Sequence, residues 1–173
     1  IKDIANKNNL YNAMIVASPG GGKTTLLRDL LRNISDTYKK TIGVVDERGE
    51  IAATYRGIPQ NDIGIFTDVI SNVSKAKGMN MLIRSMSPDI IACDEIGSKE
   101  DIEAISTAIC SGAKGIFTVH GRSIEEIMLN DNLNNLLKKN IIERIFILDD
   151  KKKGNIKEKY FFDIDKREYI KII

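Results

Sequence analysis

The chain has no tryptophan, a single histidine, two cysteines and no long apolar run. Its longest uninterrupted apolar segments, such as 13–17, are far shorter than the ~20 residues that a membrane-spanning helix requires, so we expect no transmembrane segment. Cys93 and Cys110 fall in an apolar strand pattern and an amphipathic helix pattern, which predicts buried, reduced thiols and no metal centre. Neither sign of charge dominates, since 26 basic residues face 24 acidic ones, and no basic, aromatic-rich stretch indicates a nucleic-acid partner.

The length of 173 residues is sufficient for one domain with a hydrophobic core and too short for two ordinary domains. We therefore expect residues 1–173 to form a single domain. The sequence begins without methionine and without a signal-peptide pattern, which suggests a piece of a longer protein whose upstream domain is missing.

The strongest signal is the segment 17–25, Ala-Ser-Pro-Gly-Gly-Gly-Lys-Thr-Thr, which lies between an apolar run and a helical pattern and so has the context of a P-loop. Glycines let such a loop curl so that its N–H groups face a phosphate, and the following helix adds the positive end of its dipole. Lys23 would reach the β- and γ-phosphates of ATP, and the Thr24 hydroxyl would bind Mg²⁺. The residues expected to bind the nucleotide are Ser18, Pro19, Gly20, Gly21, Gly22, Lys23, Thr24 and Thr25. Ala17 replaces the usual first glycine, and the alternative is a glycine-rich turn without a ligand.

Apolar strand patterns alternate with helical patterns along the chain, which predicts an α/β fold with a mostly parallel sheet covered by helices. One helix is expected near 99–111, with Ser98 and Asp101 as a capping box at its start. The expected strands of the sheet are 12–17, 42–46, 89–94, 115–119 and 144–148.

Two regions give weaker patterns. Glycine, proline and asparagine punctuate 49–73, where we expect loops with at most a short strand near 63–67. The run 151–153, three lysines, divides the last sheet strand from segments at 158–164 and 168–172, which predict a C-terminal hairpin or meander. The lysines favour a solvated turn, with a site for an anionic partner as the alternative.

The segment 89–95 is a buried strand pattern that ends in two acids. Asp94 would support Mg²⁺, and Glu95 would orient and deprotonate the water that attacks the γ-phosphate. An acidic residue directly after the aspartate is typical of hydrolases with an extra strand between the two motifs, here 42–46, and this predicts a RecA-like sheet. The alternative is a strand whose solvent-exposed end is merely acidic.

Further polar residues follow two other strands. Glu47 and Glu50 come after 42–46, where they could place Mg²⁺ or the attacking water, while Arg48 could pair with them or face a neighbouring subunit. His120 follows 115–119 and could sense the γ-phosphate. A surface salt-bridge cluster and a structural histidine are the alternatives.

The order of P-loop, acidic cluster, Asp-Glu pair and Thr-Val-His-Gly resembles the type II and IV secretion ATPases, which are P-loop NTPases. Within that superfamily, four strings resemble the stage III sporulation protein AA family: 23–29, 45–51, 78–89 and 117–121. By this resemblance Glu47 and Glu50 correspond to an Asp box and His120 to a His box.

The resemblance implies the C-terminal domain of an ATPase in the mother-cell cytoplasm that energises a channel to the forespore of endospore-forming bacteria. It implies a ring, expected to be a hexamer in the full-length protein, docked on membrane-bound components of the same complex, with ATP and Mg²⁺ as cofactors. A secretion or pilus motor outside sporulation, and a nucleotide-dependent scaffold with weak hydrolysis, are the alternative functions.

Overall fold

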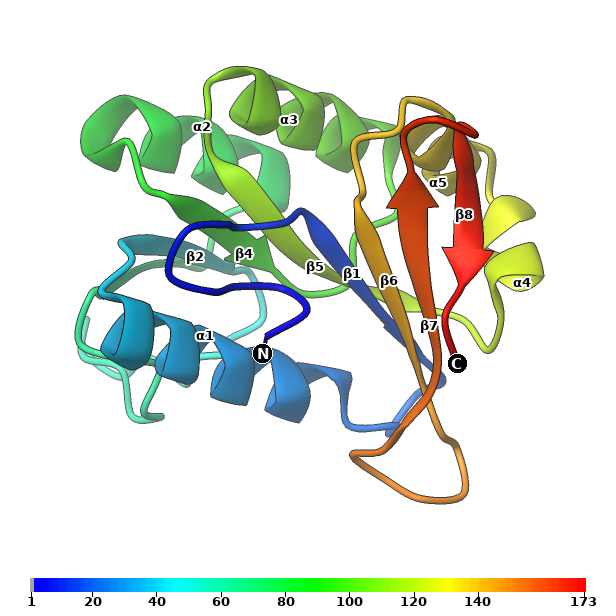
Figure 1. Cartoon of the computed structure of the whole chain (residues 1–173). Helices are drawn as coiled ribbons and strands as arrows, with labels where there is room; N and C mark the ends of the chain where they lie inside the picture. Colours follow the sequence, from blue (N-terminus) through cyan, green and yellow to red (C-terminus); the bar gives the residue numbers. More distant parts are fainter. Residues whose placement is uncertain (1) are drawn as a thin grey trace.

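The computed structural model describes residues 2–173, and an eight-stranded sheet forms the centre of the molecule (Figure 1). The strand order is β3-β2-β4-β5-β1-β6-β7-β8; the first six strands in this order are parallel, and β7 and β8 add to β6 as an antiparallel hairpin. The strands are β1 Ala13–Ala17, β2 Ile42–Asp46, β3 Thr67–Ser71, β4 Ile90–Cys93, β5 Lys114–His120, β6 Arg144–Leu148, β7 Ile156–Asp163 and β8 Glu168–Lys171. The predicted α/β class, the mostly parallel sheet and the C-terminal hairpin are confirmed.

Helices cover both faces of the sheet (Figure 1). The helix α1 packs on one face together with residues 51–63, and the other helices pack on the opposite face. Their bounds are α1 Lys23–Tyr38, α2 Lys75–Met86, α3 Lys99–Cys110, α4 Ile124–Met128 and α5 Asp131–Lys138. None of the helices in residues 2–173 combines the length and the apolar character needed to cross a bilayer.

The central strands are apolar along their whole length because both of their faces are covered. In β1, Met14 and Val16 join the cluster under α2 and α3, while Ala13 and Ile15 join the cluster under α1. This alternation packs the sheet from both sides and holds the ends of its strands in fixed positions.

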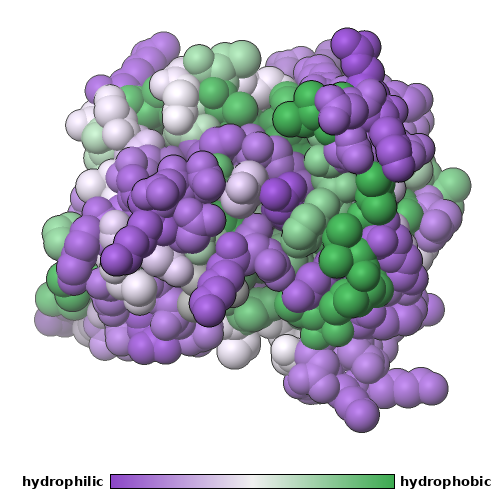
Figure 2. Space-filling model, in the orientation of Figure 1, coloured by the Kyte–Doolittle hydropathy of each residue, from purple (hydrophilic) through white to green (hydrophobic). Residues whose placement is uncertain are grey.

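Figure 2 shows one face of the molecule, which is mostly hydrophilic with an apolar patch over the region of β7.

The helix starts follow from short-range hydrogen bonds. The Ser98 hydroxyl accepts the N–H of Asp101 at 3.1 Å, and the Asp101 carboxylate accepts the N–H of Ser98 at 3.1 Å, so the predicted capping box is confirmed. The helix α1 instead begins after Gly22, which has no side chain to cap the first N–H groups. These donors therefore stay available to a ligand.

Two expectations differ from the structure. The strand expected near 63–67 lies later, at Thr67–Ser71, because Gly64 has a φ of 95° and makes a turn against Ser35. The sequence predicts that both cysteines are buried, but Cys93 is buried and Cys110 is exposed. Cys110 is exposed because a helix turns about 100° per residue, which places it away from the buried face that Ala108 occupies.

Candidate functional site

The parallel strands bring the predicted site residues to one edge of the sheet. The P-loop segment follows β1, the acids Asp94 and Glu95 follow β4, and His120 ends β5. The cluster 46–50 begins with the last residue of β2, the neighbour of β4. This carboxyl edge is where open α/β sheets bind their ligands.

The three glycines of the loop each meet a different backbone requirement. Gly20 and Gly22 have φ angles of 71° and 92°, in the left-handed region that L side chains rarely adopt. Gly21 is instead too closely packed to carry a side chain. An added Cβ would lie 2.8 Å from the Cβ of Ala17 and 3.0 Å from the carbonyl oxygen of Ser18. Ala17, at the first motif position, is thus accommodated because residue 21 has no side chain.

Lys23 folds back over this loop. Its side chain is buried, at 5 % exposure, and its ammonium donates to the carbonyl oxygens of Ala17 and Ser18 at 3.3 and 3.4 Å. Burial lowers the pKa of Lys23, although nearby carboxylates, that of Glu95 most strongly, act in the opposite direction. The ammonium also lies 3.0 Å from Nδ1 of His120, so its hydrogen-bond partners among residues 2–173 are two carbonyl oxygens and a ring nitrogen, which a phosphate could replace.

Asp94 lies between two hydroxyl groups. One oxygen accepts the hydroxyl of Thr24 at 2.5 Å, and the other accepts the hydroxyl of Thr118, which is fully buried in β5. A hydroxyl and a carboxylate are oxygen ligands of the kind that Mg²⁺ takes. No group of three or more His, Cys, Asp or Glu residues that could hold a metal ion occurs among residues 2–173.

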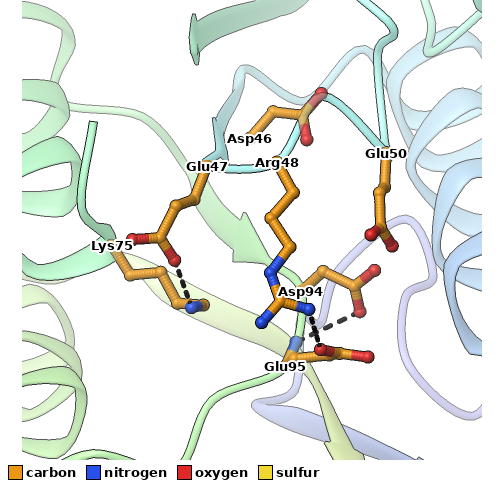
Figure 3. A pocket seen from close by; sticks show the side chains of 7 residues that line it. All are labelled: Asp46, Glu47, Arg48, Glu50, Lys75, Asp94 and Glu95. Carbon is orange, nitrogen blue, oxygen red and sulfur yellow. Dashed lines mark hydrogen bonds and ion pairs between the residues drawn. The ribbon is translucent and has the colours of Figure 1, made fainter. Parts of the chain in front are cut away.

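Glu95 is held by a cation on one oxygen and a histidine on the other. The Arg48 guanidinium donates to Oε2 at 2.6 Å (Figure 3), and Nε2 of His120 lies 2.7 Å from Oε1. Nδ1 of His120 faces the Lys23 ammonium, which can only donate, so a proton on Nε2 would point to Glu95. The backbone of Glu95 has a φ of 51°, an uncommon conformation for a side-chain-bearing residue and one found at functional sites.

The three acids of the cluster 46–50, namely Asp46, Glu47 and Glu50, have different surroundings. Asp46 is buried and accepts the N–H groups of Ile51 and Ala52 at 3.1 and 2.8 Å, which closes the loop. Glu47 turns away from Asp94 and pairs with Lys75 at 2.5 Å, while Glu50 points into the pocket (Figure 3). The residues that line this pocket are Asp46, Glu47, Arg48, Glu50, Lys75, Asp94 and Glu95.

The charge of Lys75 depends on this pairing. Burial acts against the ammonium, but the hydrogen bond with Glu47 and the neighbouring carboxylates outweigh it and raise the pKa of Lys75. The negative charge of Glu47 is therefore already paired with Lys75. This leaves Glu50 as the acid of the cluster that is better placed to orient Mg²⁺ or water.

Sequence reasoning missed several residues of the site. Thr118 could have been noticed as the one polar residue inside an apolar strand pattern, whereas nothing in the local pattern marks Lys75. Asp150, in the turn between β6 and β7, accepts the hydroxyl of Ser18. This turn lies against the P-loop segment, since its Gly154 N is 3.9 Å from a Cβ built on Gly22.

Solved structures with a similar fold include ATPases of secretion and pilus systems. The ATPase DotB from Legionella pneumophila superposes with a TM-score of 0.58 at 17 % identity, covering 99 % of this chain and 46 % of that chain. The VirB11 ATPase of the Brucella suis type IV secretion system, solved with sulphate, gives 0.60 at 18 % identity over 87 % of this chain and 48 % of that chain. The pilus retraction motor PilT, solved with bound ADP, gives 0.59 at 18 % identity over 84 % of this chain and 46 % of that chain. These likenesses confirm the RecA-like fold.

The sequence relatives share a higher sequence identity with this chain than these solved structures do. Stage III sporulation protein AA of Bacillus subtilis is 43 % identical over 143 residues, which cover 80 % of this chain and 46 % of the relative. Protein SEEDLING PLASTID DEVELOPMENT 1 of Arabidopsis thaliana is 31 % identical over 126 residues, covering 72 % of this chain and 18 % of the relative. This chain thus spans less than half the length of either relative. The family model for sporulation stage III, protein AA, matches residues 1–165. The resemblance seen in the sequence is confirmed, and the chain belongs to the sporulation stage III protein AA family.

Proposed function

We propose that this chain is a single ATPase domain of a motor that energises a sporulation-specific channel between mother cell and forespore. The observation that carries the proposal is the contact between the two motifs: the Thr24 hydroxyl of the P-loop segment binds Asp94, and Lys23 connects through His120 to Glu95. A phosphate-binding lysine, a metal-binding pair and a base are the groups that ATP hydrolysis needs.

In this proposal residues 18–25 bind the phosphates of ATP, and Lys23 exchanges its contact with His120 for the γ-phosphate. Thr24 and Asp94 would hold Mg²⁺, which neutralises charge on the phosphate oxygens when bound. Glu95 orients a water and accepts its proton. As the water oxygen forms its bond to the γ-phosphorus, the bond to the β–γ bridging oxygen breaks and its electron pair leaves with ADP.

His120 and the cluster after β2 assist these groups. When the γ-phosphate takes Lys23, His120 loses one of its two partners, so its position reports whether the phosphate is present. Glu50 would help to place Mg²⁺ or the attacking water, and Glu47 acts through Lys75 at the side of the pocket.

We further propose that the full-length protein assembles into a ring, with six subunits as the expectation, in the mother-cell cytoplasm. Membrane-bound components of the same complex would anchor it. The family membership and the fold shared with the pilus retraction motor PilT and with VirB11 support a motor of this kind.

A second candidate is a nucleotide-dependent scaffold with weak hydrolysis. The observation that favours it is that both oxygens of Glu95 already have partners, a guanidinium and an imidazole. A base that stays occupied would not take a proton from water.

Phosphate release by the full-length protein with ATP and Mg²⁺ tests the proposal. We expect K23A to lose ATP binding and E95Q to keep it while turnover falls ~10²-fold or more. K99A and E103Q, exposed on α3, are the matched controls and should behave like the wild type. ATP binding without phosphate release in the wild type would favour the scaffold, and unchanged ATP affinity in K23A would contradict both candidates.

A further inference from the structure

Two cations line the pocket of Figure 3, and their surroundings differ. The Lys75 side chain is 13 % exposed and is held by Glu47. The Arg48 side chain is 63 % exposed, and its guanidinium contacts Glu95. Arg48 is therefore the cation of this pocket that can change partners without leaving a buried charge unpaired.

Lys23 and Arg48 are connected through His120 and Glu95. The ammonium of Lys23 is 3.0 Å from one ring nitrogen of His120, and the other ring nitrogen is 2.7 Å from Glu95. Glu95 is in turn 2.6 Å from the Arg48 guanidinium. Three short contacts thus connect the two cations, and a nucleotide phosphate that replaces His120 at Lys23 would lie at one end of this chain of contacts, with Arg48 at the other.

The backbone that carries Arg48 is anchored. The bonds from Ile51 and Ala52 to the buried carboxylate of Asp46 close the loop between β2 and residue 52. In addition, the Arg28 guanidinium donates to the carbonyl oxygens of Glu50 and Ile51 at 3.0 and 2.9 Å. The loop is held at its base while the long side chain of Arg48 extends over the pocket (Figure 3).

The charges during hydrolysis favour a change of partner by Arg48, from Glu95 to the phosphoryl group, when the water is deprotonated. Before the reaction, Arg48 is paired with the Glu95 carboxylate. When Glu95 accepts the proton of the attacking water it becomes neutral, and its attraction for the guanidinium falls. The phosphoryl oxygens beside it carry the negative charge at that moment, and a planar guanidinium matches their geometry.

We propose that Arg48 is a catalytic residue of this chain, whose guanidinium stabilises in cis the charge of the transferring phosphoryl group. The inference rests on the proposed function, in which Lys23 binds the γ-phosphate and Glu95 is the base. A different role, in which Arg48 only restrains Glu95, predicts the opposite effect of removing it, because a released base would be more active.

The first experiment compares R48A, R48K and R32A in the full-length protein. Arg32 is the matched control, because it pairs with Asp29 at 2.7 Å on the exposed side of α1, outside the site. We expect R48A to lower turnover ~10³-fold, the low end of the range for catalytic arginines, with ADP affinity unchanged. R48A should also lose the tight binding of ADP with aluminium fluoride, a mimic of the transferring phosphoryl group, which a structural role would not affect selectively.

R48K keeps the charge without the planar fork and should recover part of the turnover; if R48A does not fold, R48K against R32A decides. Turnover in R48A equal to or above that of the wild type would overturn the inference while leaving the proposed function intact. A wild type that neither binds nor hydrolyses ATP would instead refute the proposed function, and the inference with it.

The second experiment mixes R48A subunits with E95Q subunits in the assembled protein. If Arg48 acts in cis, every site in the mixture lacks either the arginine or the base, and activity stays at the level of the separate variants. If Arg48 acts on a neighbour's site, some R48A subunits receive an intact arginine from E95Q subunits. Recovered activity would therefore overturn the assignment in cis.

Discussion

Replacing Thr118 with valine tests how the two acids after β4 are held in place. The Thr118 hydroxyl donates to Asp94 and accepts the N–H of Glu95 at 2.8 Å, so one group orients both acids. Valine has nearly the same shape and removes only these two bonds. The N–H of Glu95 keeps a second acceptor, the Asp94 carboxylate at 3.1 Å, so the main loss is one hydrogen bond to a charged group.

A hydrogen bond to a charged group contributes about 1.5–3 kcal/mol, and the added methyl returns up to about 0.8 kcal/mol by its burial. We therefore expect T118V to lower the free energy of unfolding by about 1–2 kcal/mol, which corresponds to a fall in Tm of about 2–8 °C. Turnover should fall as well, because Asp94 and Glu95 lose their common support.

Urea unfolding and phosphate release measure the two effects. The control is T107V, whose hydroxyl donates to the Glu103 carbonyl at 2.9 Å on the exposed side of α3, and it should change stability by no more than about 0.5 kcal/mol. T118V as stable and as active as T107V would refute the reasoning that this hydroxyl organises the acids.

Three further predictions follow from the site and the assembly. H120A should keep near-normal ATP affinity and lose turnover, because His120 connects Lys23 to Glu95; wild-type turnover in the assembled ring would make it structural. One thiol per folded chain should react with a thiol reagent, because Cys110 is exposed whereas burial raises the pKa of Cys93 well above its usual value. Rapid reaction of both thiols would contradict this. Specific ATPase activity of the full-length protein should rise with concentration as light scattering reports assembly, because in the proposed ring a neighbour would add positive charge to that of Arg48; a flat, high activity from a monomer would leave Arg48 as the sufficient cation.

Much of the fold was predictable because its signals are local. A strand covered on both faces must be apolar throughout, and such runs alternate with helical patterns along this chain. The P-loop segment was equally readable, since the constraints at Gly20, Gly21 and Gly22 come from the loop's own backbone and from Ala17. The short strand was misplaced because the turn at Gly64 depends on its packing against α1, which the local sequence does not reveal.

The chemical groups at the strand ends follow from the sequence alone, whereas the tertiary structure brings particular groups among them into contact. The register of the parallel strands pairs Val45 with Cys93 and Cys93 with Phe117. One residue further along each strand stand Asp46, Asp94 and Thr118, and this common level lets Thr118 reach Asp94. Pairs such as Glu95 with Arg48 or Glu47 with Lys75 are far apart in the chain, and their contact depends on strand order and register, for which no local pattern is sufficient.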